Sequence, residues 1–127
     1  MFKNLTIAAF LGFFAILLGA FGAHALKEQL TVGALSNFNT GVRYQMYHVV
    51  VVFFVNGVSL LSEKQKNTIS YLFFTGIVLF SGSIYLIYLA PISATSIWFI
   101  TPLGGLFLLS GWLYMMLIFM HKIKPKK

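Results

Sequence analysis

The stretch that decides the fold is LTIAAFLGFFAILLGAFGAHAL, residues 5–26, an apolar run interrupted only by Thr6, small residues and His24. Three further apolar runs follow it, at residues 44–61, 69–90 and 98–120. At about 1.5 Å per residue, runs of roughly 18–23 residues can cross a hydrocarbon core of about 30 Å, the second run only just. Since lipid offers no partner for unpaired backbone groups, each run is predicted to be a helix. We therefore expect an all-α fold, an integral membrane four-helix bundle that forms a single domain over residues 1–127.

The composition also points to lipid. Of the 127 residues, 59% are hydrophobic and only 9% are charged, whereas a soluble domain carries about 25% charged residues. This scarcity of charge argues against a soluble monomer, a disordered chain and a nucleic-acid-binding domain. The net charge is +7, and the cations stand at the edges of the apolar runs, where they can meet anionic lipid headgroups. Cysteine is absent, so no disulfide or thiolate metal site can form.

The distribution of Lys and Arg predicts the orientation, because cytoplasmic loops carry an excess of these residues. With four spans, the N-terminus, the second loop and the C-terminal tail share one side of the membrane. The cations expected on that side are Lys3, Lys64, Lys66, Lys122, Lys124, Lys126 and Lys127. The other side holds only Lys27 and Arg43. Both termini, including the basic tail at residues 121–127, are therefore expected in the cytoplasm.

Small residues form a stripe along the first span. Its members are Ala8, Gly12, Ala15, Gly19 and Gly22. Their spacing of three or four residues places them on one helical face. The fourth span contributes Gly104, Gly105 and Gly111. Because small residues let membrane helices approach closely, these positions are predicted to serve helix packing. An interface between two copies of the chain is the alternative use of the same stripe.

The segment between the first and second spans, residues 27–43, is too polar to cross a membrane. Its apolar residues recur at roughly helical spacing; they are Leu30, Ala34, Leu35, Phe38 and Val42. This pattern predicts a short amphipathic helix lying on the outer surface. We expect Thr31 to cap that helix and Gly41 to break it before the second span.

One face of the second span is polar. Gln45, His48, Asn56 and Ser59 fall within about 80° of arc on a helix that turns about 100° per residue. Polar groups at membrane depth are costly and normally face the bundle interior. These side chains are predicted either to hydrogen-bond between helices or to form one wall of a polar path.

Further polar residues are expected to join this face near the outer leaflet. The candidate polar cluster comprises His24, Arg43, Gln45, His48, Asn56, Ser81, Tyr85, Tyr88 and Thr101. Each member also has a plain explanation. The tyrosines would be interface anchors, Arg43 would extend its guanidinium to phosphate, and His48 would be a hydrogen-bonded structural residue.

The residue types argue against catalysis. The two carboxylates, Glu28 and Glu63, lie outside the spans, which excludes an aspartyl intramembrane protease and a carboxylate-based metal phosphotransferase. The two histidines of the candidate polar cluster are too few for a typical catalytic zinc site, although they leave haem ligation by His24 and His48 open. No G-x-S-x-G elbow is present in the sequence. We expect no catalytic residue, no metal and no cofactor.

Five short motifs together carry a family resemblance. They are GAFGAHAL at residues 19–26, GVRYQMYH at 41–48, FSGSIYL at 80–86, TPLGG at 101–105 and SGW at 110–112. The chain resembles the transmembrane-protein-256-like (YwdK/YgdD) family of small membrane proteins, a domain of unknown function. The resemblance implies a four-span bundle in the bacterial plasma membrane, and it implies no established activity, substrate or catalytic residue.

The sequence favours a non-enzymatic membrane protein with an accessory or lipid-interacting role, in which Arg43 and tyrosines engage headgroups. The alternative is a small transporter or channel with a polar path along the second span, lined by Gln45, His48, Asn56 and Tyr85. The expected partners are the lipid bilayer and its anionic headgroups. A second copy of the chain, or another membrane protein, is a further candidate partner. No nucleic-acid partner is expected.

Overall fold

The computed structural model describes residues 1–90 and 92–123. Within them the chain forms four helices and no strand; the helices are α1 (Phe2–His24), α2 (Val32–Gly57), α3 (Glu63–Leu89) and α4 (Ile100–Ile123). The all-α prediction is therefore confirmed. The last four residues of the predicted basic tail, 124–127, lie outside the described residues, and the part from His121 to Ile123 belongs to α4.

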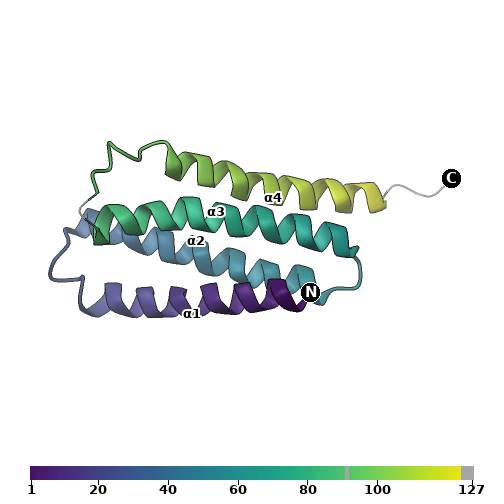
Figure 1. The fold of residues 1–127 in the computed structure, drawn as a ribbon, viewed down its shortest axis with the longest axis horizontal. Helices are drawn as coiled ribbons and strands as arrows, with labels where there is room; N and C mark the ends of the chain where they lie inside the picture. Colours follow the sequence, from purple (N-terminus) through teal and green to yellow (C-terminus); the bar gives the residue numbers. More distant parts are fainter. Residues whose placement is uncertain (91, 124–127) are drawn as a thin grey trace.

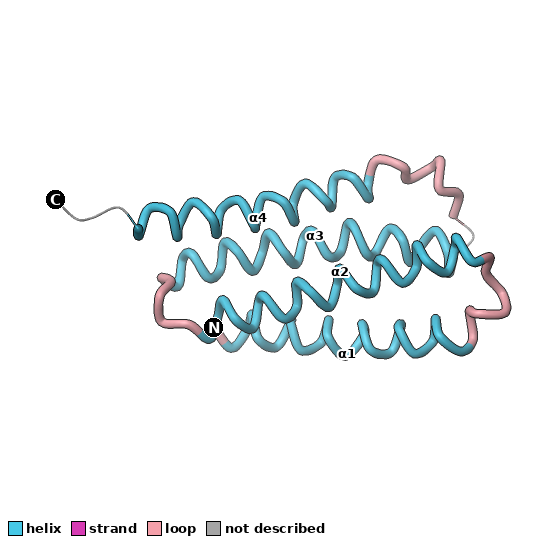
Figure 2. Tube along the Cα trace, turned by 180° about the vertical axis from the view of Figure 1, so that it is seen from behind, coloured by secondary structure: helices cyan, strands magenta, loops and turns pink. Residues whose placement is uncertain are grey.

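The four helices run antiparallel in chain order, and each packs mainly on the next. Extensive helix contacts in the described residues join α1 with α2, α2 with α3, and α3 with α4. The bundle is thus an open row, with α1 and α4 at its two edges (Figure 1). The loop between α2 and α3 lies at the same end as the N-terminus, and the loop between α1 and α2 lies at the opposite end (Figure 2).

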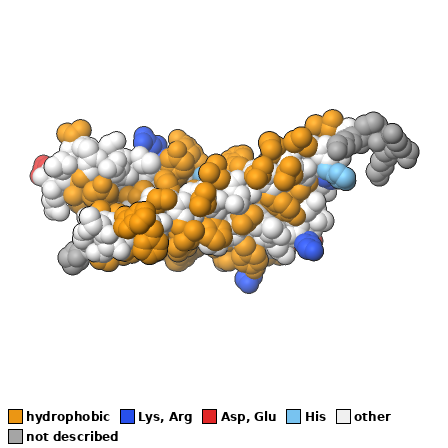
Figure 3. Space-filling model, turned by 90° about the horizontal axis from the view of Figure 1, so that it is seen from above, with side chains coloured by type: hydrophobic (Ala, Val, Ile, Leu, Met, Phe, Trp, Pro, Cys, Tyr) orange, Lys and Arg blue, Asp and Glu red, His pale blue; other side chains and the backbone are white. Residues whose placement is uncertain are grey.

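The outer surface of the helices is apolar. Three helices of the described residues, α1, α3 and α4, are long and apolar enough to cross a membrane. Large hydrophobic side chains stand exposed on their free faces, such as Phe13 and Leu109, each at 65%. Figure 3 shows hydrophobic side chains along the length of one face, with few charged side chains among them. The fold is therefore an all-α membrane bundle.

The α2 helix differs from the other three because its first half is polar. The predicted second span begins at Tyr44, but the helix ends at Gly57 and residues 58–61 lie outside it. Residues 44–57 cover only about 21 Å at 1.5 Å per residue, less than a hydrocarbon core of about 30 Å. Its polar first half explains why α2 does not appear among the membrane-capable helices, although it runs between α1 and α3 (Figure 1).

The predicted amphipathic surface helix is corrected by the structure, because its residues form the first turns of α2 itself. Gly41 does not break this helix. A Cβ at Gly41 would lie 3.2 Å from Ile84 Cγ2, so the glycine allows α2 and α3 to approach closely. Phe38 is fully buried, which ties the segment to the bundle rather than to a membrane surface. The predicted cap is confirmed, since Thr31 Oγ1 accepts a hydrogen bond of 3.1 Å from the Ala34 amide.

Two other boundaries depend on local chemistry. The α3 helix begins at Glu63, six residues before the predicted run, because Ser62 and Gln65 form a reciprocal capping box. The α4 helix begins at Ile100, two residues after the predicted start at Trp98. The core lies along the middle of the row, where α3 supplies Ile69 and Phe73, both fully buried.

Candidate functional site

The predicted polar face of α2 is divided among different neighbours. Gln45, His48 and Asn56 are all buried, and each bonds a different set of groups. Ser59 lies beyond the end of α2 and is exposed. Every buried side-chain nitrogen and oxygen in the described residues has a hydrogen-bond partner. The polar face therefore works through separate contacts rather than as one continuous site.

Gln45 links three helices. Its Nε2 donates to the Leu11 carbonyl of α1 at 2.6 Å, and its Oε1 accepts from the Tyr85 hydroxyl of α3 at 2.7 Å. Leu11 lies within α1, where its carbonyl also accepts a backbone hydrogen bond of the helix. The bond from Gln45 is therefore an additional link between α1 and α2. The side-chain amide of Gln45 thus fixes how α1 and α3 are positioned along α2.

His48 joins α2 to α4. Its Nδ1 lies 2.6 Å from the Tyr44 carbonyl, and its Nε2 lies 3.0 Å from the Trp112 Nε1 atom. Since an indole N–H only donates, Nε2 of His48 must be the acceptor and Nδ1 must carry the proton. His48 is therefore a neutral imidazole with both nitrogens engaged, and its ring also lies 5.0 Å from that of Phe73.

Two serines of α3, Ser81 and Ser83, link this helix to α2 and α4. Ser81 Oγ donates to the Gly41 carbonyl of α2 at 2.6 Å. Ser83 Oγ donates to the Phe80 carbonyl and shares a short hydrogen bond with the Thr101 hydroxyl at the start of α4. Ser81 and Thr101 were members of the predicted cluster, and both act as helix-to-helix contacts.

Asn56 is separate from the rest of the predicted cluster, near the opposite end of α2. Its Nδ2 donates to Ser70 Oγ at 2.9 Å, and its Oδ1 accepts from Asn4 Nδ2 at 3.1 Å. Asn4 also donates to Asn67 Oδ1 at 2.8 Å. Sequence reasoning missed this network, although Asn4 stands directly before the first apolar run and could have been recognised as a polar group on the stripe of small residues.

The remaining members of the cluster lie at the surface. His24 ends α1 and is exposed. The Tyr88 hydroxyl accepts from Asn37 Nδ2 at 2.9 Å. Arg43 is exposed, and its Nη2 lies 3.3 Å from Thr40 Oγ1. No carboxylate of the described residues lies within 4.0 Å of the Arg43 guanidinium, so it retains donors for a group outside the chain.

The structure does not bring His24 and His48 together. Gly12 of α1 faces Val49 of α2, whereas Gly22 faces Phe38. His24 therefore lies beyond the level of Phe38, ten residues or about 15 Å along α2 from His48. This separation removes the haem alternative. Within the described residues, no three His, Cys, Asp or Glu side chains gather as a metal site.

The stripe of small residues on α1 faces α2. Ala8 and Ala15 are buried, and Cβ atoms built at Gly12 and Gly19 would lie 3.3 and 3.4 Å from Val49 and Val42. Gly22 is tighter, at 2.9 Å from Phe38. The stripe thus packs on α2 within one chain, with Gly12 and Gly19 partly exposed at the edge of the contact.

The glycines of α4 differ in how closely α3 approaches them. A Cβ at Gly104 would collide with the Phe80 backbone nitrogen, and one at Gly111 would lie 2.5 Å from the Phe73 ring. At Gly105 the nearest atom is 3.9 Å away. Gly104 and Gly111 are therefore packing positions, whereas Gly105 opens onto a groove.

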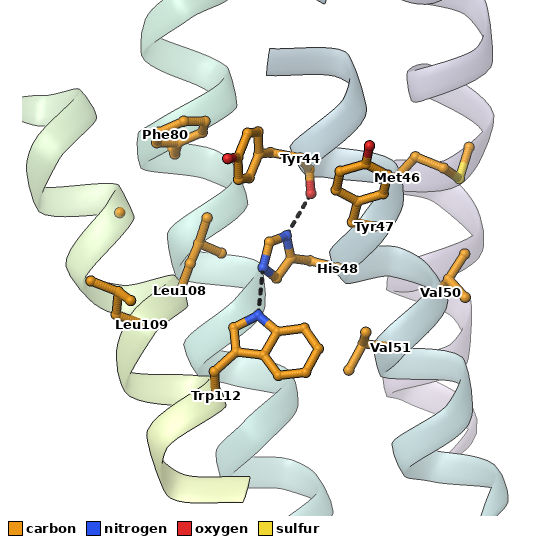
Figure 4. A pocket seen from close by; sticks show the side chains of 11 residues that line it. Tyr44, Met46, Tyr47, His48, Val50, Val51, Phe80, Leu108, Leu109 and Trp112 are labelled. Carbon is orange, nitrogen blue, oxygen red and sulfur yellow. Dashed lines mark hydrogen bonds between the residues drawn. The ribbon is translucent and has the colours of Figure 1, made fainter. Parts of the chain in front are cut away.

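That groove lies between α2 and α4 and has a volume of about 710 Å³, within the range of small-molecule sites. We call it the α2–α4 groove. Its lining residues are Tyr44, Met46, Tyr47, His48, Val50, Val51, Phe80, Gly105, Leu108, Leu109 and Trp112. Figure 4 shows the two tyrosines on one side of His48 along the groove and Trp112 on the other. The lining is almost wholly apolar, and both nitrogens of the His48 imidazole are already hydrogen-bonded.

A second groove runs along the other side of α2, against α1. It consists of two adjoining hollows of about 690 and 450 Å³ that share Ile16, Ala20 and Met46. We call it the α1–α2 groove. Arg43 and Tyr47 line one of its hollows. The α2 residues that line both this groove and the α2–α4 groove are Met46, Tyr47 and Val50, and they form a ridge between them.

The fold and the site define a small helical membrane protein whose buried polar side chains are all engaged internally and whose grooves are apolar. The chain belongs to the DUF423 family, described as a protein of unknown function, whose family model matches residues 18–105. The predicted family is thereby confirmed, since the relatives include YwdK and YgdD.

The relatives are uncharacterised bacterial membrane proteins. A UPF0382 membrane protein of Haemophilus influenzae is 42% identical over 111 residues, covering 87% of this chain and 88% of its own. The UPF0382 membrane protein YwdK of Bacillus subtilis is 40% identical, covering 78% and 80%. The inner membrane protein YgdD of Escherichia coli is 34% identical, covering 88% and 85%. No solved structure gives a significant match.

Proposed function

We propose that the protein is a non-enzymatic, lipid-interacting accessory protein of the bacterial plasma membrane, with both termini in the cytoplasm. The observation that carries this proposal is the pair of apolar grooves along α2, next to an exposed arginine without a carboxylate partner among the described residues. Grooves on the flank of a membrane bundle face hydrocarbon. An uncompensated guanidinium at their end suits a lipid phosphate.

The orientation rests on the distribution of cations. Lys3 near the start of α1, Lys64 and Lys66 near the start of α3 and Lys122 in the last turn of α4 belong to the end of the bundle that holds the N-terminus. On the other side, Lys27 lies in the loop between α1 and α2 at the opposite end, and Arg43 lies in the first half of α2. This asymmetry is the pattern of cytoplasmic termini. Arg43 then lies in the outer half of the bundle, because the neighbouring Tyr44 contacts the Phe80 ring and Phe80 packs on Gly104 in the second turn of α4.

The alternative is a small transporter or channel with a polar path along α2. The polar side chains offer it little support, because Gln45, His48 and Asn56 are each hydrogen-bonded to a neighbouring helix. A conducting path needs groups that can exchange partners with water or solute. The lipid-interacting role is therefore favoured.

The test is purification in mild detergent followed by native mass spectrometry. We expect phospholipid to remain bound to the wild-type protein and anionic species to be lost from the Arg43→Ala variant. A protein that carries no lipid under these conditions contradicts the proposal. Proton- or solute-dependent flux in liposomes that His48→Ala abolishes, with the variant still folded, would instead establish the transporter.

A further inference from the structure

We infer that α2 carries a specific site for one two-chain anionic phospholipid, which straddles the helix with its phosphate at Arg43 and one chain in each groove. This inference rests on the proposed lipid-interacting role. It adds the class of lipid, the number of chains and the residues that hold each part.

The headgroup end of the site is defined by charge and by helical spacing. Arg43 and Tyr47 are four residues apart and therefore neighbours on the same face of α2, and both are exposed. Thr40, one turn before Arg43, is hydrogen-bonded to its guanidinium. The Thr40 hydroxyl accepts from Arg43 and donates its own proton to the Ser36 carbonyl, so it positions the guanidinium. A guanidinium and a phenol are thus neighbours on one exposed face of α2, and a phosphate is the acceptor that these two donors fit.

The two acyl chains of the lipid are assigned to the two grooves that begin at this ridge. Tyr47 lines both of them, so a headgroup held at Arg43 and Tyr47 stands at the point where the grooves separate. From there the α2–α4 groove leads along Val51 to Trp112 (Figure 4), and the α1–α2 groove leads along Ala20 and Ile16 to Phe53. One chain on each side of Val50 fills both grooves, whereas a one-chain lipid leaves one of them to bulk lipid.

The protein has positions at which a larger side chain can fill each groove without disturbing the bundle. Gly105 has 3.9 Å of clearance and lines the α2–α4 groove, so Gly105→Leu should occupy it. Its control is Gly82→Leu, since a Cβ at Gly82 meets nothing within 4 Å and Gly82 lines a different hollow. Exposed Ala20 lines the α1–α2 groove, so Ala20→Trp should fill that groove, with Ala23→Trp as its control.

The experiment titrates the full chain with phosphatidylglycerol, one-chain lysophosphatidylglycerol and zwitterionic phosphatidylethanolamine, and counts bound lipid by native mass spectrometry. We expect one tightly bound phosphatidylglycerol and weaker binding of the other two lipids. Arg43→Gln should lower phosphatidylglycerol affinity at least about tenfold, because a charge-assisted bond is lost, whereas Lys27→Gln should not. Gly105→Leu and Ala20→Trp should each reduce the affinity to that of the one-chain lipid.

The outcomes separate this inference from the proposed function. If phospholipid binds but Arg43→Gln keeps the preference for an anionic headgroup, the assigned headgroup site is wrong. If Gly105→Leu and Ala20→Trp bind phosphatidylglycerol like the wild type, with unchanged thermal stability, the two-chain mode is wrong while the lipid-interacting role stands. If no lipid of any class binds, both fail together.

Discussion

At the scale of single residues, the polar side chains of α2 act as connections between particular helices. Gln45 bonds groups of α1 and α3, His48 bonds Trp112 of α4, and Asn56 bonds Asn4 of α1. Helical spacing predicted that these side chains share a face. It could not predict their partners, because a partner depends on the register between helices, which one sequence does not contain. For that reason Trp112 and Asn4 were not recognised as site residues.

The bond between Tyr85 and Gln45 gives a prediction about stability. Tyr85→Phe removes the only side-chain donor to Gln45 Oε1 among the described residues. We expect a loss of about 0.6–1.7 kcal/mol, the range of hydrogen bonds between membrane helices. Unfolding in a denaturing detergent measures it. Tyr47→Phe is the control, because that hydroxyl is on the exposed ridge; equal losses in both variants would argue against the Gln45 contact.

The contact between His48 and Trp112 gives a prediction about a tautomer. The structure requires the proton on Nδ1 of His48, since Trp112 donates to Nε2. Nitrogen NMR of histidine-labelled protein should show an unprotonated Nε2 at this residue. In Trp112→Phe that nitrogen loses its donor, and its resonance should shift. A proton found on Nε2 in the wild-type protein would refute the contact.

At the scale of helices, close approach is governed by a few glycines and not by all of them. The sequence predicted the stripe on α1 and the glycines of α4 as packing positions. It could not separate tight positions from open ones, since adjacent Gly104 and Gly105 differ only in the direction they face. Helix ends were also harder to predict than helix faces. The polar start of α2 suggested a separate helix, but buried Phe38 and the close contact at Gly41 hold it in line with the rest.

Adjacent glycines on α4 offer a matched pair. Gly104→Ala places a Cβ against the Phe80 backbone, which cannot move aside without shifting α3, and should destabilise the bundle by about 2–3 kcal/mol. Gly105→Ala has room and should stabilise α4 by up to about 1 kcal/mol through its higher helix propensity. Thermal unfolding in detergent compares them. Similar effects of the two changes would contradict the α3–α4 contact.

The stripe on α1 allows a second comparison. Gly12→Leu pushes a large side chain toward Val49, which is already 3.3 Å from the Cβ position, and should cost about 1–3 kcal/mol. Phe13→Leu changes a side chain that is 65% exposed and should stay within about 0.5 kcal/mol. The same unfolding assay measures both, and equal effects would count against the α1–α2 packing face.

At the scale of the whole molecule, the open row of helices explains why the protein has grooves. In a closed bundle α1 and α4 would pack on each other and cover the face of α2 between them, whereas here that face keeps an exposed ridge between two apolar grooves. Composition predicted the membrane fold class because apolar length and scarce charge are properties of the chain itself. The grooves were not predictable, since they depend on which helices remain apart.

Orientation is also tested at this scale. The chain contains no cysteine, so single cysteines can be introduced without background. Lys64→Cys in the first turn of α3 should react with an impermeant maleimide only after the cell is opened. Ser93→Cys in the loop before α4 should react in intact cells. The reverse pattern would overturn the assignment of both termini to the cytoplasm.

The central claim, an anionic lipid held along α2, is tested most directly by the fluorescence of Trp112. The chain has two tryptophans, and Trp98 lies in the loop before α4. The Trp98→Phe variant therefore has one tryptophan, Trp112, which lines the α2–α4 groove. In bilayers containing phospholipids with brominated chains, the account predicts that anionic lipid quenches Trp112 at a lower mole fraction than zwitterionic lipid, and that Arg43→Gln abolishes this difference. Equal quenching by both lipids in the presence of Arg43 would contradict it.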